Sequence, residues 1–446
     1  MRVLAFRKRL RHMIQTKGAT SQMDQVISKE LAKFLENSPS VFHAVDNMEN
    51  ILTREKFTRL YENQRWALSP GGRYFVARNG SSLIAFTIPD HDFKGLRIMA
   101  SHSDSPTFKI KENPELETDG HYIRLNVERY GGMLCAPWFD RPLSVAGRVI
   151  VKDPVSGSFL TKLVNIDRDL VLIPNLAIHM NREANNSYKY NAQKDMLPLY
   201  GDLSAKDTFI KTVADAAGVR ESDILGHDLF LYNREKASIW GASGEFISCG
   251  RLDDLQCTFA SLKGFLAGKK QEYMALHCVF DNEETGSGTK QGAASTFLYD
   301  TLTRIHDSLG LTREDYLIHL ADSLMISADN AHAVHPNYTD KADPSNRPYL
   351  NSGIVIKFNA NQKYCTDGIS AAMFRDICRT ADVPVQTFTN RSDMAGGSTL
   401  GNISNTQVAL NTVDIGLPQL AMHSPYETAG VKDTGYLIRA AEEFFR

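Results

Sequence analysis

The sequence YMALHCVFDNEETG at residues 273–286 joins an apolar run to a cluster of acids. Its first eight residues are typical of a buried strand, and Asp281, Glu283 and Glu284 follow almost at once. Carboxylates directly after a buried strand are costly unless a positive charge lies among them. Paired glutamates there suit a division of work, in which one carboxylate binds a metal and the other moves protons. Taken alone, the run is also compatible with an ordinary surface turn.

Four other short segments gather the same kinds of side chain. They hold His102 and Asp104 in SHSDSP (101–106), Asp253 and Asp254 in GRLDDL (250–255), Asp329, His332 and His335 in ADNAHAVH (328–335), and His423 in AMHSP (421–425). Each has a simpler interpretation when it is taken alone. His102 is then a loop residue, the adjacent aspartates cap a helix, and His423 is a core residue.

Together, these segments favour a metal site. Most of them follow predicted strands, and ligands collect at the carboxyl ends of strands in an α/β sheet. Histidines with several carboxylates suit zinc, cobalt or manganese, and a shared aspartate can bridge two ions about 3.5–4 Å apart.

The order of predicted elements favours an α/β fold with an insertion. Strands are expected at 83–88, 96–100, 273–280, 324–328 and 408–413, and helices from about Asp24 to Ser38 and at 254–266, 369–380 and 432–445. From about 106 to 246 short strand-like runs dominate, such as 147–151 and 170–173. We therefore predict an α/β domain in two parts, residues 1–106 and 246–446, around an inserted β-rich domain at 107–245.

Composition indicates a globular protein that is not built around nucleic acid or a membrane. Of the 446 residues 42% are hydrophobic and 23% charged, and the net charge is −2. No apolar run approaches the roughly 18–20 residues of a spanning helix. The cysteines form no CxxC pair, which favours reduced thiols in a cytoplasmic protein. Residues 1–24 are a basic extension, interpreted as a solvated segment, with an organelle leader as the alternative.

Over about residues 25–446 the chain resembles the aspartyl aminopeptidase family of co-catalytic zinc exopeptidases. Besides the acidic segments, the matching stretches are ENSPSVFHAV (36–45), WFDRPLSVAGR (138–148), NANQKY (359–364) and GLPQLAMHS (416–424). The resemblance implies a mixed-sheet zinc-exopeptidase (phosphorylase/hydrolase-like) catalytic domain that is interrupted by a β-rich dimerisation domain. Residues 133–137, 391–394 and 425–427 resemble the bacterial-type branch more than the eukaryotic one.

Carried onto matching positions, the family pattern implies two Zn²⁺ per subunit, with Co²⁺ or Mn²⁺ as substitutes. The implied ligands are His102, Asp253 and Asp329 for one ion and Asp253, Glu284 and His423 for the other, with Asp253 bridging. Glu283 resembles the family's general base, and Asp104 resembles the carboxylate that orients His102.

The resemblance also implies a role for the insertion and a pocket. His179 matches a histidine that reaches a neighbouring subunit's active site, although its own context favours a strand residue with a local partner. His332, Lys357 and Tyr364 match positions that line the substrate pocket. Lys357 is expected to pair with an acidic substrate side chain, against the simpler interpretation of a solvated lysine. Family members assemble as tetrahedral dodecamers built from dimers, which restricts substrates to peptides.

The function these features predict is a metal-dependent aminopeptidase that releases one N-terminal residue, expected to be Asp or Glu. One alternative keeps the fold and changes the reaction to deacylation of N-acyl amino acids. Another is a catalytically silent shell or scaffold protein, which predicts a lost ligand or base. Every position that the family pattern requires is filled here.

Overall fold

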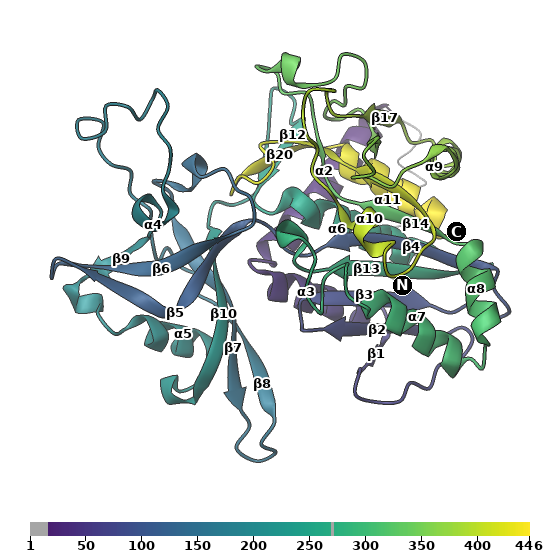
Figure 1. Ribbon diagram of the computed structural model, residues 1–446, viewed down its shortest axis with the longest axis horizontal. Coiled ribbons are helices and arrows are strands. Elements are labelled where there is room, and N and C mark those ends of the chain that lie inside the picture. Colours follow the sequence, from purple (N-terminus) through teal and green to yellow (C-terminus); the bar gives the residue numbers. More distant parts are fainter. Residues whose placement is uncertain (1–16, 269–271) are drawn as a thin grey trace.

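A nine-stranded mixed sheet is the largest of the three sheets that the described residues form, and it lies in the right-hand part of the molecule in Figure 1. The computed structural model describes residues 17–268 and 272–446. In sheet order the strands are β1 (Thr58–Leu60), β2 (Arg73–Arg78), β3 (Ser82–Thr87), β13 (Tyr273–Phe280), β4 (Gly95–His102), β14 (Leu324–Ala328), β18 (Asn411–Gly416), β16 (Ile354–Lys357) and β17 (Val385–Phe388).

The central strands β13, β4, β14 and β18 are mutually parallel, so their carboxyl ends share one edge of the sheet. Phe280 at the end of β13 lies opposite His102 at the end of β4. These strands are buried over nearly their whole length because helices cover both faces of the sheet.

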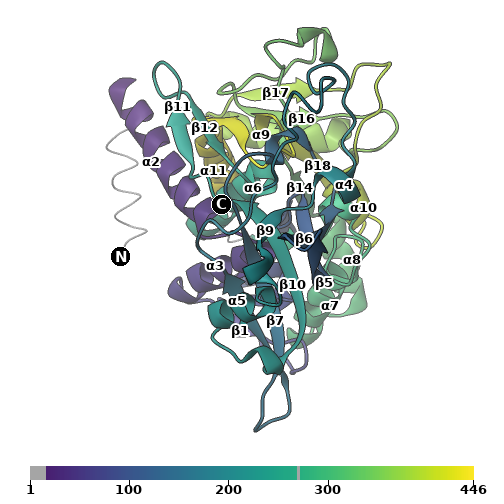
Figure 2. The same cartoon turned by 90° about the vertical axis from the view of Figure 1, so that its left-hand side faces the viewer.

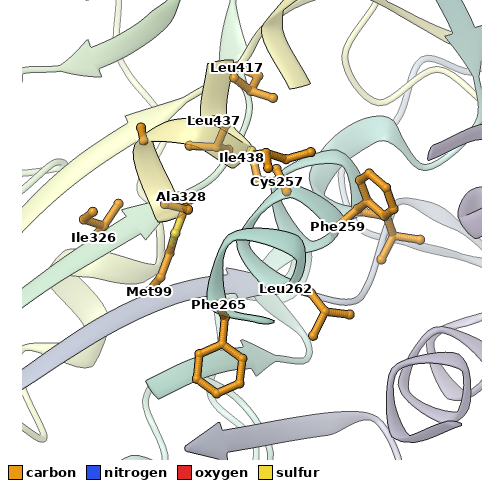
Figure 3. Packing of buried hydrophobic residues seen from close by; sticks show 14 of the residues in the cluster. Met99, Cys257, Phe259, Leu262, Phe265, Ile326, Ala328, Leu417, Leu437 and Ile438 are labelled. Atoms are coloured by element: carbon orange, nitrogen blue, oxygen red, sulfur yellow. The ribbon is translucent and has the colours of Figure 1, made fainter. Parts of the chain in front are cut away.

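Helices cover the two faces as two groups. The first group is α2 (Lys17–Glu36), α3 (Val41–Arg54), α6 (Leu252–Ala267), α9 (Gly368–Thr380) and α11 (Asp433–Phe444), and the second is α7 (Phe297–Ser308), α8 (Arg313–Ala321) and α10 (Leu400–Ser404). Side chains of β4 alternate between them, since Met99 packs with the first group and Ile98 with the second. Figure 3 shows α6 within the first core, with Met99 and Ile326 on one side of the helix and Phe259 and Leu262 on the other.

A six-stranded antiparallel sheet lies beside the first one in Figure 1, faces the viewer in Figure 2 and is built from residues 107–233. Its order is β8 (Phe159–Asn165), β7 (Leu143–Lys152), β10 (Ile224–Asn233), β5 (Thr107–Thr118), β6 (Tyr122–Tyr130) and β9 (Leu199–Asp202). The helices α4 (Ala192–Asp195) and α5 (Phe209–Ala217) accompany it. Its core is separate from the other two and contains Phe108, Trp138 and Phe209.

A small third sheet joins distant parts of the chain. Its order is β11 (Ser238–Trp240), β12 (Phe246–Cys249), β20 (Glu427–Gly430), β19 (Pro418–Leu420) and β15 (Ala331–His332). Although β11 lies inside the predicted insertion, it pairs with β12, so the six-stranded sheet ends earlier, at Asn233. None of the described helices is long and apolar enough to cross a membrane.

The α/β prediction is confirmed, with corrections in detail. The strands expected at 273–280 and 324–328 have those bounds, whereas the one expected at 408–413 is β18, which begins later. Residues 170–173 form only isolated bridges, because Val171 and Ile173 pair with single residues. The helix expected from about Asp24 is α2, which already includes Lys17, and residues 1–16 of the basic extension lie outside the described residues. All six cysteines are free, as expected.

Candidate metal centre

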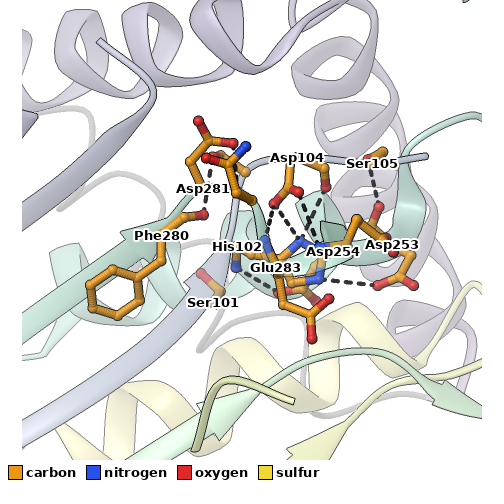
Figure 4. A network of polar contacts seen from close by, with 12 residues as sticks. Ser101, His102, Asp104, Ser105, Asp253, Asp254, Phe280, Asp281 and Glu283 are labelled. Atoms are coloured by element: carbon orange, nitrogen blue, oxygen red, sulfur yellow. Dashed lines mark hydrogen bonds and ion pairs between the residues drawn. The ribbon is translucent and has the colours of Figure 1, made fainter. Parts of the chain in front are cut away.

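The parallel strands bring the predicted ligands to one edge of the nine-stranded sheet. His102 ends β4, Asp329 directly follows β14, and Glu284 lies in the 3₁₀ turn η4 (Glu283–Thr285) just after β13. Asp253 lies in the first turn of α6, where its φ and ψ are −81° and 110° and therefore not helical. His423 lies between β19 and β20 with a φ of 67°. Figure 4 shows His102, Asp104, Asp253 and Glu283 close together.

One group of ligand atoms surrounds the His102 ring. Its Nε2 atom lies 3.6 Å from Asp253 Oδ1 and 3.7 Å from Asp329 Oδ1. Burial acts to lower the pKa of His102, but the surrounding carboxylates, Asp254 above all, raise it well above its usual value. The ring is 1% exposed, so these interactions take place away from bulk water.

A second group shares Asp253. His423 Nε2 lies 3.4 Å from Asp253 Oδ2 and 3.3 Å from Glu284 Oε2. The two oxygens of Asp253 thus face different histidines, one in each group. In each group the candidate ligand atoms lie within 4.8 Å of one another.

The residues present fit a divalent cation. Asp253 Oδ1, Asp254 Oδ1 and Glu284 Oε1 are buried oxygens without a hydrogen-bond partner among the described residues. Burial raises the pKa of Glu283 to about 8 and, together with the Asp253 carboxylate, raises that of Glu284 well above its usual range. A bound cation relieves this crowding of negative charge, and histidine with carboxylate is a ligand set that zinc accepts.

Asp104 supports this centre through contacts with His102 and with the backbone of Glu283 and Glu284. Its Oδ1 accepts from the backbone N–H of Glu283 at 3.1 Å, and its Oδ2 accepts from that of Glu284 at 3.2 Å. His102 Nδ1 lies 3.1 Å from the Asp104 carbonyl and 3.4 Å from its Oδ1. The aspartate therefore holds both the histidine ring and the acidic turn, which is the kind of contact that orients metal ligands.

Two acids hold candidate ligands in place through hydrogen bonds that the sequence did not predict. Asp254 accepts from the backbone N–H of His102 at 3.0 Å, and α6 has no side-chain cap, so the helix-cap interpretation is wrong. The buried Glu427 accepts from the N–H of His423 at 2.8 Å and from that of Asp253 at 3.0 Å. A glutamate at the end of a short hairpin carries no local signal for contacts across 174 residues.

The predicted pocket residues lie beside Asp329. Lys357 is 2% exposed, and its Nζ lies 3.3 Å from Asp329 Oδ2 and 3.0 Å from the Asn330 carbonyl, so the interpretation as a solvated lysine is wrong. Burial acts to raise the pKa of Asp329, but Lys357 and His102 hold it below its usual value. The Lys357 ammonium is 5.3 Å from the Tyr364 ring centroid. The rings of Tyr364 and His332 both contact Phe388.

His179 lies away from this centre. It is an exposed residue in the turn at 178–180 rather than a strand residue, within an irregular stretch that follows the bridges at 171–173. The apolar side chains of Leu176, Ile178 and Met180 beside it are also exposed, Met180 by 75%.

A cavity of about 330 Å³ lies between the two large sheets. Its lining includes Asp104 and Glu427, together with Tyr130, Phe230 and Arg148 of the six-stranded sheet. It is therefore formed by residues that support the candidate ligands rather than by the ligands themselves.

Residues 34–445 match the model of the family described as aminopeptidase I zinc metalloprotease (M18). A curated relative from Clostridium acetobutylicum, named "Probable M18 family aminopeptidase 2", is 48% identical and covers 94% of this chain and 98% of its own. The structure titled as the Ape4 and Nbr1 complex has a TM-score of 0.92 at 35% identity and covers 96% of this chain and 87% of its own. The Saccharomyces cerevisiae mApe1 dodecamer has a TM-score of 0.83 at 27% identity, with coverage of 94% and 96%.

Proposed function

The chain belongs to the M18 family of aminopeptidase I zinc metalloproteases, and from this premise we propose that it is a two-zinc aminopeptidase selective for an N-terminal Asp or Glu. That it is a metal-dependent aminopeptidase follows from the family. The observation that carries the two-metal proposal is the position of Asp253, whose two oxygens face His102 and His423 at 3.6 and 3.4 Å.

In this proposal Asp253 bridges the two ions. His102 and Asp329 complete one ligand set, and Glu284 and His423 complete the other. Support comes from Asp253 and Glu284, each of which has one buried carboxylate oxygen without a hydrogen-bond partner among the described residues. A bound cation would give these oxygens a partner. Lys357 and Thr399 engage only the second oxygen of Asp329, so Oδ1 faces His102.

Bound zinc would supply a water of lowered pKa and polarise the scissile carbonyl. Glu283 would take the proton of that water and pass it to the leaving amine. Asp104 holds the backbone of Glu283 through a hydrogen bond of 3.1 Å, which fixes where the base lies relative to the ligands. Both carboxylates of the acidic turn thereby have separate tasks, Glu284 as a ligand and Glu283 as the base.

Selectivity for an acidic first residue is proposed from the positive charge of Lys357. Its ammonium is buried and is shared between Asp329 and a backbone carbonyl. A substrate carboxylate that approached past His332 and Tyr364 would meet this charge in a site of low dielectric, where a charge-assisted hydrogen bond is strong.

We further propose that residues 107–245 form a dimerisation domain and that the subunits build a homo-oligomer, a tetrahedral dodecamer. The exposed Leu176, Ile178 and Met180 around His179 support an interface there, because apolar side chains gathered on one loop favour contact with a partner. His179 would then enter a neighbour's site. The free thiols fit a reducing compartment, and we propose the cytoplasm.

A panel of free-amine and N-acylated aminoacyl substrates tests the reaction. We expect release of N-terminal Asp and Glu from free-amine substrates by the zinc, cobalt or manganese form. Turnover of only the N-acylated substrates would favour a deacylase, and turnover of neither would favour a silent shell protein. Activity that is equal for all first residues would overturn the acidic selectivity.

Glu283→Gln should retain its metals and lose about 10²–10⁴-fold in kcat, because the amide cannot accept the proton of the water. Metal analysis beside kinetics measures both quantities. Glu314→Gln changes an exposed glutamate of α8 in the same way and serves as the control. Turnover of Glu283→Gln near that of the control would remove Glu283 from this role.

Asp253→Ala should lower occupancy at both metal positions, since it removes the shared ligand, whereas His423→Ala should empty mainly one. Metal stoichiometry after dialysis against a weak chelator separates the two variants. Normal metal content in Asp253→Ala would contradict the bridge.

His179→Ala should lower kcat by about 10²–10³-fold if its imidazole donates to the oxyanion in a neighbour's site. The exposed His121, in the turn between β5 and β6, changed to alanine, is the matched control. Co-assembly of His179→Ala with Glu283→Gln subunits should restore part of the activity, because a mixed pair contains one complete site. No recovery in verified mixed assemblies would mean that His179 acts within its own subunit or only in the fold.

A further inference from the structure

The end of strand β6 leaves the six-stranded sheet and runs along the candidate metal centre. Residues 130–134, which we name the β6 brace, read Tyr-Gly-Gly-Met-Leu. They contact three separate parts of the centre: Asp104, the η4 turn and His423. These three parts lie more than 100 residues apart in sequence, and Asp104 and Glu284, for example, are separated by 180 residues.

Tyr130 connects the inserted sheet to the carboxylate behind His102. Its hydroxyl donates to Asp104 Oδ2 at 2.6 Å and accepts from Asn282 Nδ2 at 2.8 Å. Its ring packs edge-on against Phe230 of β10, with 5.8 Å between centroids. The position of the hydroxyl is therefore set by the six-stranded sheet, while its hydrogen bonds act on the other sheet.

Gly131 fits against the ligand turn because it has no side chain. Its φ is +75°, and a Cβ placed there would lie 3.1 Å from Glu284 Cβ and 3.3 Å from the Glu284 carbonyl oxygen. Only glycine adopts this backbone readily and allows so close an approach.

The remaining brace contact holds His423. The backbone N–H of Leu134 donates to the His423 carbonyl at 3.2 Å. His423 lies on a hairpin loop with a left-handed backbone, and its N–H donates to Glu427 Oε1 at 2.8 Å within the same segment.

We propose that the β6 brace is a positioning element through which the inserted sheet, within the same subunit, completes the metal centre. Docking of the brace fixes Asp104, Glu284 and His423 relative to one another, so that their ligand atoms converge. The inference rests on the two-zinc function proposed above. Contacts that orient metal ligands are worth about 10–100-fold in metal affinity or activity.

Tyr130→Phe should weaken zinc binding by about 10–100-fold, because it removes only the hydroxyl that holds Asp104 and Asn282. Tyr122→Phe is the matched control, since Tyr122 begins the same strand and is 55% exposed. Zinc affinity is measured on the full chain by competition with a chelating indicator. The absorption spectrum of the cobalt form reports the coordination geometry, and the Tm of the metal-free protein reports the fold.

Gly131→Ala tests the brace at a second position. Gly120→Ala is its control, because Gly120 has a similar φ of +67° while its Cβ would lie 4.0 Å from the nearest atom, Glu117 Oε1. Both variants carry the same backbone strain, and only Gly131→Ala presses on Glu284. We expect an altered cobalt spectrum and weaker zinc binding in Gly131→Ala alone.

Weaker zinc binding in either brace variant than in its control, at an equal Tm of the metal-free proteins, supports the brace. Equal zinc affinity and equal cobalt spectra in both variant–control pairs overturn it, whatever the activity. If the unmodified protein binds no zinc, the two-zinc function itself has failed, which is a different result from an active enzyme that tolerates the brace variants.

Discussion

The structure depends on the burial of several carboxylates at one edge of its central sheet. Asp253, Asp254 and Asp104 are each at most 3% exposed, and Glu283 and Glu284 lie beside them. Isolated charges in such a place are strongly destabilising, because protein surroundings solvate them far less well than water does. Backbone N–H groups, Lys357 and the rings of His102 and His423 offset part of this cost. Asp253 Oδ1, Asp254 Oδ1 and Glu284 Oε1 remain without a hydrogen-bond partner among the described residues, and the first of them faces the His102 ring.

The buried carboxylates differ in how far neighbouring groups balance their negative charge. Asp329 is paired with Lys357, which helps to hold the pKa of its carboxyl down. Glu284 lies instead near the rings of His423 and His102, and burial raises its pKa. Glu427 accepts two backbone N–H groups and so ties Asp253 to His423 without adding a ligand atom. Contacts to the backbone thus hold the candidate ligands in position. The negative charge that a cation would balance lies between the two histidines.

The sequence predicts the parts of this arrangement that follow from local pattern. The strands at 273–280 and 324–328 were predicted with their observed bounds, since strands buried on both faces are continuous apolar runs between polar ends. The candidate ligands follow from the acids and histidines that end those runs, combined with the family resemblance. The third sheet was missed because its strands are two to four residues long and pair across the chain, as in β12 with β20. Glu427 and Tyr130 were missed because their partners are set by tertiary structure alone.

The position of the insertion explains why it borders the metal centre. The chain leaves the nine-stranded sheet at His102, the last residue of β4, and returns to it through β12 and the first turn of α6 at Asp253. Both ends of the insertion are therefore anchored at residues that face each other across 3.6 Å. A domain inserted between such points has to pack near them, and the chain at the end of its strand β6 lies where it reaches Asp104 and His423. An insertion at the opposite edge of the sheet would leave the ligands without this support, because the amino ends of the parallel strands lie a full strand length away.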